Sequence, residues 1–255
     1  MSVTQAFIPT NPIPGEFEGR RALVTGGSRG IGAAVAQQLI DGGATVVTSA
    51  RNRTEDTPKD STFVSADIRT ADEARRLVDG TLEALGGLDL LVNNAGAARV
   101  HLTGIPDEEW EDSLAINFLS AVRVTSAALP ALQHSDRAAI VNVSSGVSAN
   151  PAAPILHYGA AKAALESWSK GLATQLSPSG IRVNTVVLGM VQTPGGSDVL
   201  ETMVAAMGAT AEEAYASIPL GRGGDARDVA EAIAFLLSSR AQWIAGTALH
   251  VNGGA

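Results

Sequence analysis

The stretch Thr25-Gly26-Gly27-Ser28-Arg29-Gly30-Ile31-Gly32 lies between a short apolar run and a segment of helical period. Glycines at such a junction allow a tight turn, a close approach of phosphate oxygens to backbone amides, and close packing of a helix on a strand. The first turn of a helix also attracts anions, because its amide groups are free and its dipole is positive there. The stretch therefore predicts a nucleotide-binding turn with the glycine spacing G-x-x-x-G-x-G.

Short apolar runs alternate with longer helical segments, such as Ala71–Leu85, over the rest of the chain. This alternation is typical of a parallel sheet with crossover helices. The predicted strands are Ala22–Thr25, Thr45–Ser49, Thr62–Ala66, Leu88–Val92, Ala139–Val143, Arg182–Val187 and Thr247–Val251. We therefore expect an α/β fold with a single-domain, Rossmann-like, doubly wound parallel sheet of about seven strands and helices on both faces. Residues 1–18 are predicted to form an N-terminal arm, and residues 19–255 the dinucleotide-binding domain.

The composition excludes several kinds of site and partner. The chain of 255 residues carries 18 Lys and Arg against 26 Asp and Glu, a net charge of −8, so no nucleic-acid partner is expected. It has no cysteine, which excludes disulfides, thiolate metal sites and a cysteine nucleophile. No apolar run approaches the roughly 18 residues of a membrane span, and no Lys or Arg precedes Arg20 as in a signal peptide. We therefore expect no membrane partner and a cytoplasmic location.

Tyr158 and Lys162 stand four residues apart, which on a helix places a phenol beside an ammonium. Taken alone, such a pair is more often an exposed helix face. Apolar residues at helical spacing follow it, however, and indicate a helix packed on the core, with the pair at the carboxyl edge of the sheet where ligands bind. A neighbouring ammonium is expected to lower the tyrosine pKa from its usual value of about 10, which favours acid–base chemistry near neutral pH.

Together these features resemble the short-chain dehydrogenase/reductase family over about residues 19–254. Besides the glycine turn and the Tyr158/Lys162 pair, the chain has Ser145 thirteen residues before the tyrosine, as in the family. The other motifs that carry the resemblance are Asn93-Asn94-Ala95-Gly96, Asn117 within Ala115-Ile116-Asn117-Phe118, Ile181-Arg-Val-Asn184, Gly189-Met-Val-Gln-Thr193, Pro219-Leu-Gly-Arg222 and Val251-Asn-Gly-Gly254.

The resemblance implies an oxidoreductase that transfers a hydride between a nicotinamide and a carbonyl or alcohol substrate. Tyr158 would act as general acid or base, Lys162 would lower its pKa and hold the nicotinamide ribose, Ser145 would donate to the substrate oxygen, and Asn117 would hold a water or main-chain carbonyl behind Lys162. Thr193 would contact the carboxamide and Asp67 would face the adenine. The implied cofactor-binding residues are Gly26, Ser28, Arg29, Gly30, Ile31, Gly32, Arg51, Asp67, Ile68, Asn94, Ala95, Gly96, Tyr158, Lys162, Gly189, Val191 and Thr193.

The residues after the second predicted strand favour NADP(H) over NAD(H). The family often places there a carboxylate that bonds the adenosine ribose and repels a 2′-phosphate, whereas this chain has Ala50 followed by Arg51. Arg29 adds a second cation, although both arginines could simply be solvated. The twelve residues from Ala50 to Ser61 are too few for a full crossover helix and are expected to form a loop.

The segment 194–218 is predicted to cover the substrate, with a hinge at Gly195-Gly196 and an apolar helical face formed by Val199, Leu200, Met203, Val204 and Met207. No Lys, Arg or His lies between Val183 and Gly221, so an anionic substrate would find no steering charge. We therefore expect an uncharged ketone or secondary alcohol. A 3-oxoacyl thioester on an acyl carrier protein is the second alternative, and a non-catalytic nucleotide-sensing regulator of the same fold is the third.

Two residues depart from the family pattern. Leu188 replaces a usual proline, so the loop over the nicotinamide is expected to be held differently, and Asn252 replaces a usual aspartate with a local effect only.

The resemblance implies a homotetramer or homodimer that pairs the helices Asp107–Leu132 and Tyr158–Leu176 across two-fold axes. No metal site is expected, because the four histidines, His101, His134, His157 and His250, show no metal-ligand spacing.

Overall fold

A seven-stranded parallel sheet forms the centre of the protein, with the strand order β3-β2-β1-β4-β5-β6-β7. The computed structural model describes residues 12–206 and 208–255. The strands are β1 (Arg21–Thr25), β2 (Thr45–Ala50), β3 (Thr62–Ser65), β4 (Leu90–Asn93), β5 (Ala139–Ser145), β6 (Arg182–Leu188) and β7 (Ala248–Val251). Each lies at its predicted place, with ends that differ by at most two residues, and this confirms the doubly wound α/β fold.

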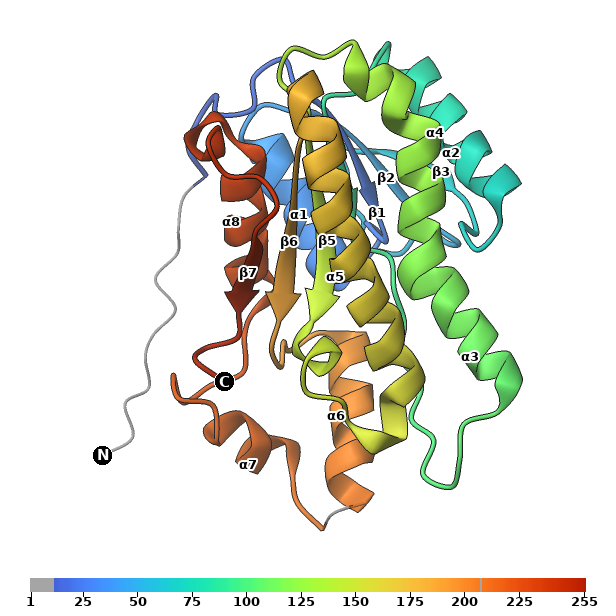
Figure 1. Ribbon diagram of the computed structural model, residues 1–255. Helices are drawn as coiled ribbons and strands as arrows, with labels where there is room; N and C mark the ends of the chain where they lie inside the picture. Colours follow the sequence, from blue (N-terminus) through green and yellow to red (C-terminus); the bar gives the residue numbers. More distant parts are fainter. Residues whose placement is uncertain (1–11, 207) are drawn as a thin grey trace.

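Helices cover both faces of the sheet (Figure 1). On one face α1 (Gly30–Asp41) and α8 (Ala226–Leu237) pack against each other and on buried residues of the central strands. On the other face lie α2 (Ala71–Leu85), α4 (Ser120–Gln133) and α5 (Leu156–Leu176). The central strands are therefore buried on both faces and read as short continuous apolar runs, whereas the edge strands β3 and β7 are partly exposed.

The helix predicted at Asp107–Leu132 is not a regular α-helix. Its first part, α3 (Asp107–Leu114), leads into a π-helical turn, η1 (Ala115–Leu119), and then into α4. Ser120 N–H accordingly bonds to the carbonyl of Ala115, five residues back, and the Ser120 hydroxyl donates to the carbonyl of Ile116 over 2.6 Å. Such π-turns insert one residue into a helix and often occur at functional sites, and Asn117 lies in this one.

By length and hydropathy alone, one helical stretch of the described chain, Asp107–Gln133, could cross a membrane. Five of its first six residues are acidic, and its parts pack against α2 and α5. The same length and hydropathy are found in helices that cover the core of a globular domain.

The N-terminal segment joins the core before residue 19. Phe17 is buried, its amide donates to the carbonyl of Gly42 over 2.8 Å, and its ring packs with the apolar residues of α1. Residues 1–11 of the predicted arm lie outside the described residues. Phe17 thus belongs to the hydrophobic core and not to a surface arm.

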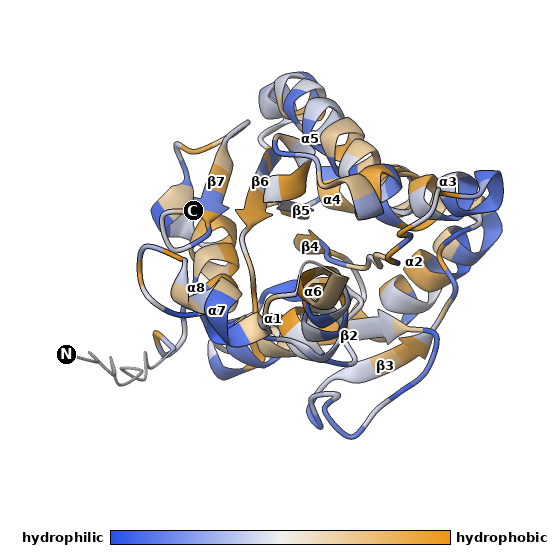
Figure 2. Cartoon of the chain, turned by 90° about the horizontal axis from the view of Figure 1, so that it is seen from below, coloured by the Kyte–Doolittle hydropathy of each residue, from blue (hydrophilic) through white to orange (hydrophobic). Residues whose placement is uncertain are grey.

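Two helices lie below the carboxyl ends of the strands, where Figure 1 shows α6 (Pro194–Ala206) and α7 (Ala211–Ala216). Viewed from this side in Figure 2, α6 crosses in front of the sheet edge near α1. Gly195 and Gly196, predicted as a hinge, lie in the first turn of α6, so the chain there is helical. Val204 is buried, and Met207 of the predicted apolar face lies outside the described residues.

Candidate active site

The glycine turn is packed so closely that side chains cannot replace its glycines. Gly26 and Gly30 have φ angles of +65° and +57°, which residues with a Cβ rarely adopt. A Cβ at Gly32 would lie 2.2 Å from the carbonyl oxygen of Gly26. Asn94, from the loop after β4, holds the turn by donating to the carbonyls of Thr25 (3.0 Å) and Gly26 (3.2 Å). The turn thus presents free amides at the start of α1, as a phosphate site requires.

The loop after β2 is tied to this turn. The hydroxyls of Thr54 and Thr57 both donate to the carbonyl of Ser28, the latter over 3.4 Å, while Ser65 donates to the carbonyl of Arg51 over 2.7 Å. Residues 51–61 contain turns and no helix, as predicted. Arg29 and Arg51 are exposed on these two neighbouring segments, and neither guanidinium pairs with any other residue that the structure describes.

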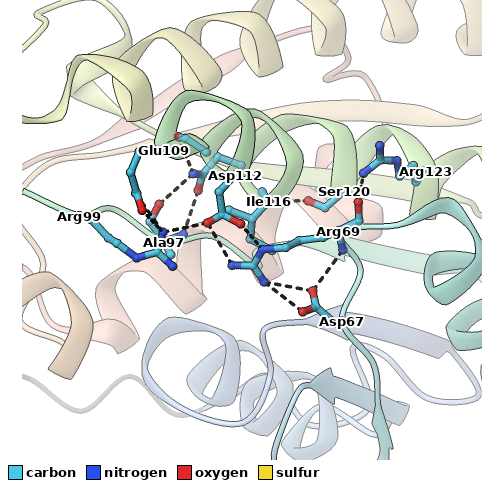
Figure 3. Close-up of polar contacts among 11 residues, drawn as sticks. Asp67, Arg69, Ala97, Arg99, Glu109, Asp112, Ile116, Ser120 and Arg123 are labelled. Atoms are coloured by element: carbon cyan, nitrogen blue, oxygen red, sulfur yellow. Dashed lines mark hydrogen bonds and ion pairs between the residues drawn. The ribbon is translucent and has the colours of Figure 1, made fainter. Parts of the chain in front are cut away.

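Asp67 and Ile68 follow β3 at the same edge. The Asp67 carboxylate accepts from Arg69 over 3.0 Å, and Arg69 also reaches Asp112 of α3 (Figure 3). Ile68 is buried. The predicted adenine-facing carboxylate is therefore held by an arginine in this structure and is still about half exposed.

The segment after β6 approaches the glycine turn from the other side. Leu188, at the end of β6, is buried and pairs with Ser145 and Val251, while Gly189 N–H donates to the carbonyl of Val251 over 3.1 Å. Val191 forms an isolated parallel bridge with Gly224, and Thr193 lies about 3.5 Å from where a Cβ of Gly30 would be. Neighbouring strands thus hold this loop in place without the usual proline.

The side chains of Ser145 and Tyr158 interact at the carboxyl end of β5. The preceding serine, Ser144, is buried and donates instead to Glu166 over 2.5 Å, so Ser145 is the serine that faces the tyrosine. Burial raises the pKa of Tyr158 to about 12, and the neighbouring Ser145 hydroxyl opposes this only in part. The expectation that the tyrosine pKa is lowered is therefore wrong for the protein without cofactor.

Lys162 explains this difference. Its ammonium lies 5.6 Å from the centroid of the Tyr158 ring and donates to the carbonyl of Val143 over 2.8 Å. Burial lowers the pKa of Lys162 to about 8, while the nearby carboxylate of Glu166 acts in the opposite direction. Desolvation thus disfavours the charged form of both groups, and its effect exceeds that of their mutual attraction.

Asn117 connects the Tyr158/Lys162 pair to the loop after β4. Its amide nitrogen donates to the carbonyl of Ala97 over 2.8 Å, and its amide oxygen accepts from the Ala97 amide over 2.9 Å. A Cβ at Gly96 would lie 2.8 Å from that oxygen and 3.4 Å from the Lys162 nitrogen. The side chains of Asn117 and Lys162 thus converge on the backbone of Gly96 and Ala97, and the former holds a main-chain carbonyl as expected.

A family model described as enoyl-(acyl carrier protein) reductase matches residues 26–255, which is most of the chain. The chain belongs to the short-chain dehydrogenase/reductase family. It is 34% identical over 245 residues to a 3-oxoacyl-acyl-carrier-protein reductase, FabG, of Vibrio cholerae, covering 93% of this chain and 98% of that protein. As a short-chain dehydrogenase/reductase it is an oxidoreductase that interconverts carbonyl and alcohol groups with a nicotinamide cofactor.

Solved structures of other short-chain dehydrogenases/reductases show the same fold. Aldohexose dehydrogenase of Thermoplasma acidophilum superposes with a TM-score of 0.87 at 26% identity, covering 94% of this chain and 95% of that one. A short-chain dehydrogenase of Burkholderia cenocepacia in complex with NADP superposes with a TM-score of 0.81 at 32% identity, covering 94% and 98%.

This short-chain dehydrogenase/reductase also contains a side-chain cluster that the sequence did not indicate. His101, Glu109 and His157 come from three separate elements, and their ligand atoms lie within 4.8 Å of one another. Linear spacing could not have revealed the cluster, because a long helix and a strand separate the two histidines.

Proposed function

We propose that the chain is an NADP(H)-dependent carbonyl reductase and alcohol dehydrogenase whose proton is transferred by Tyr158. The observation that carries this proposal is the meeting of the Ser145, Tyr158 and Lys162 side chains at the carboxyl end of β5, with the Lys162 ammonium 5.6 Å from the tyrosine ring. A partly buried phenol with a raised pKa holds its proton at neutral pH and can give it to a carbonyl oxygen.

The chain's own residues fit a dinucleotide. The glycine turn leaves no room for a Cβ at Gly26 or Gly32, so phosphate oxygens can reach the amides at the start of α1. The nicotinamide supplies or accepts the hydride. Tyr158 donates its proton to the substrate oxygen, Ser145 donates a hydrogen bond to the same oxygen, and Lys162 favours the tyrosinate that forms.

The remaining members of the proposed site have supporting roles. Asn117 positions the backbone of Ala97 next to Lys162, and Asn94 holds the glycine turn. Gly189, Val191 and Thr193 would close the site from the β6 side.

The preference for NADP(H) rests on Arg29 and Arg51. Both arginines are exposed and unpaired within the described residues. Arg29 lies in the glycine turn and Arg51 in the loop after β2, and Thr54 and Thr57 of that loop bond to the carbonyl of Ser28 in the turn. A guanidinium can bind a 2′-phosphate through two charge-assisted hydrogen bonds, each contributing about 1.5–3 kcal/mol.

The test is to measure kcat/KM with NADPH and with NADH for the wild type, Arg51→Ala, Arg29→Ala and a matched control, Arg75→Ala, on an exposed turn of α2. We expect each of the first two substitutions to lower kcat/KM with NADPH by about 10–100-fold, to leave the value with NADH unchanged, and the control to change neither. Equal wild-type values for the two cofactors would refute the preference.

The substrate is proposed to be an uncharged ketone or secondary alcohol under the cover formed by residues 194–218. Four acidic residues and no basic residue lie in this segment: Asp198, Glu201, Glu212 and Glu213. A negative potential slows the approach of anions. The second candidate is a 3-oxoacyl thioester, which the similarity to FabG of Vibrio cholerae favours.

One assay separates the candidates. Oxidation of NADPH is followed with ethyl acetoacetate and with acetoacetyl-coenzyme A, which carry the same 3-oxo group without and with phosphate charges. We expect a higher kcat/KM for the ester. A higher value for the thioester would replace the first candidate by the second, and cofactor binding without turnover of either compound or of other carbonyls would indicate a nucleotide-sensing protein.

A further inference from the structure

His101, Glu109 and His157 meet beside the start of α5, outside the proposed catalytic group. His101 lies in the loop after β4, Glu109 in α3, and His157 in the first turn of α5. The His101 Nε2 atom lies 3.5 Å from an oxygen of Glu109, and the ring centroids of the two histidines are 5.5 Å apart. Two imidazoles and one carboxylate therefore share one small volume, with all ligand atoms within 4.8 Å.

The two histidines have unused nitrogens at this place. His157 is only 2% exposed, and its Nδ1 atom is buried without a hydrogen-bond partner in the described chain. Nε2 of His101 is also buried and makes no hydrogen bond there, and its nearest charged neighbour is the Glu109 oxygen at 3.5 Å. A buried polar atom without a partner costs about 1–3 kcal/mol, so native proteins usually provide one. Burial, the adjacent His101 and the nearby Arg99 lower the pKa of His157, while Glu109 opposes this.

We propose that His101, Glu109 and His157 form a binding site for a divalent transition metal, with zinc as the preferred ion. Two nitrogens and one oxygen match the ligands of zinc, whereas magnesium and calcium prefer oxygen alone. Ligands of a tetrahedral zinc ion at about 2.0–2.1 Å lie about 3.3 Å from one another. The His101–Glu109 distance of 3.5 Å is already close to this separation, and the other ligand-to-ligand distances, at most 4.8 Å, would have to shorten by up to about 1.5 Å.

A fourth ligand and an access route are available. A cavity of about 360 Å³ is lined by His101, Trp110 and Leu156, which flank the cluster, together with residues of the loops before α3 and α5. Water from this cavity can complete the coordination, as in zinc sites with three protein ligands. None of the proposed catalytic side chains lines the cavity.

Arg99 can release Glu109 to the metal. Its guanidinium contacts both oxygens of Glu109, at 3.1 and 3.0 Å, and also Asp112, at 2.9 Å (Figure 3). Asp112 would remain as the partner of Arg99 when a metal takes one oxygen of Glu109. A carboxylate has about four lone-pair sites, so Glu109 can also bind both cations at once.

The metal would cross-link three elements next to the reacting groups. The amide of His101 already donates to the carbonyl of Pro154 over 2.9 Å, which joins the loop after β4 to the residues before α5. A shared metal would add a second link, and His157 directly precedes Tyr158. Binding to the folded state alone would then raise the melting temperature with the logarithm of the metal concentration once that concentration exceeds Kd.

The test uses the full-length protein after removal of metals with a chelator. Zinc binding is measured by isothermal titration calorimetry and by the shift of the melting temperature, and cobalt(II) is added separately because tetrahedral coordination gives intense visible bands. The variants are His101→Gln and Glu109→Gln, whose side chains are partly exposed. The matched control is His250→Gln, at an exposed position of β7.

We expect one zinc ion per chain in the wild type and in His250→Gln. Loss of a partner that only supports a metal ligand already costs about 10–100-fold in affinity, so His101→Gln and Glu109→Gln should bind at least about tenfold more weakly and lose the cobalt bands. Absence of saturable zinc binding to the wild type would overturn the proposal. Equal affinity of the wild type and His101→Gln would also overturn it, since the ion would then bind elsewhere.

Discussion

Lys162→Met should remove a pH-dependent part of the stability of the protein without cofactor. The lysine is 3% exposed, and burial lowers its pKa from 10.5 to about 8. Between these two pH values the unfolded chain holds the proton on Lys162 and the folded chain does not. The free energy of unfolding of the wild type should therefore rise with pH relative to the variant, by about 1.4 kcal/mol per pH unit and about 3 kcal/mol over the whole window.

The difference in the free energy of unfolding between the wild type and Lys162→Met at neutral pH is less informative than the change of this difference with pH. The variant no longer buries an ammonium there, but it also loses the hydrogen bond to the carbonyl of Val143, whose unsatisfied oxygen costs about 1–3 kcal/mol. These two effects have opposite signs and similar size, whereas only the ammonium contributes to the slope between pH 8 and 10.5.

The assay is urea unfolding followed by tryptophan fluorescence at several pH values from about 7 to about 10.5. Lys170→Met, at an exposed position of the same helix, controls for loss of a lysine without loss of burial. If the stability difference between the wild type and Lys162→Met stays constant across this range, the reasoning from burial is refuted.

Three further outcomes are expected. Tyr158→Phe should keep the fold and the affinity for cofactor but lose nearly all turnover, because only the transferable proton is removed; steady-state kinetics and cofactor titration measure the two quantities. Gly32→Ala should weaken cofactor binding by about tenfold or more, since its Cβ would lie 2.2 Å from a carbonyl oxygen, whereas Gly171→Ala, with open space around it, should not. Trp243 is 98% exposed in the single chain, so we propose that it lies at a contact between subunits; Trp243→Ala should then lower the molar mass measured by light scattering from that of a homotetramer or homodimer.

The sequence predicted the sheet well because each strand combines apolar residues with turn residues at its ends. Strands buried on both faces read as short apolar runs, and the glycine turn marks where β1 ends and α1 begins. Ser145 and Tyr158 could also be paired from their spacing once the family resemblance had been noted. Local sequence therefore carried most of the fold and the core of the candidate site.

Three features depend on tertiary contacts and could not be predicted from the sequence. The π-turn at Ala115–Leu119 has no local signal, because its residues are also good α-helix or core residues. The pKa of Tyr158 is set by burial more than by Lys162, and the depth of burial follows from packing. The cluster of His101, Glu109 and His157 forms only when the start of α5 packs against α3 and the loop before it.

The order of the strands has a consequence for folding during synthesis. After β4 has paired with β1, each later strand adds to the same edge of the sheet in the order in which it leaves the ribosome: β5, then β6, then β7. On this side of the sheet, the edge that is open at each stage is therefore the one that the next strand will cover, while β3 forms the opposite edge throughout. Unpaired apolar strands attract other chains, and domains generally fold from the N-terminus during synthesis. Growth in chain order keeps each exposed edge short-lived and so limits aggregation of the nascent protein.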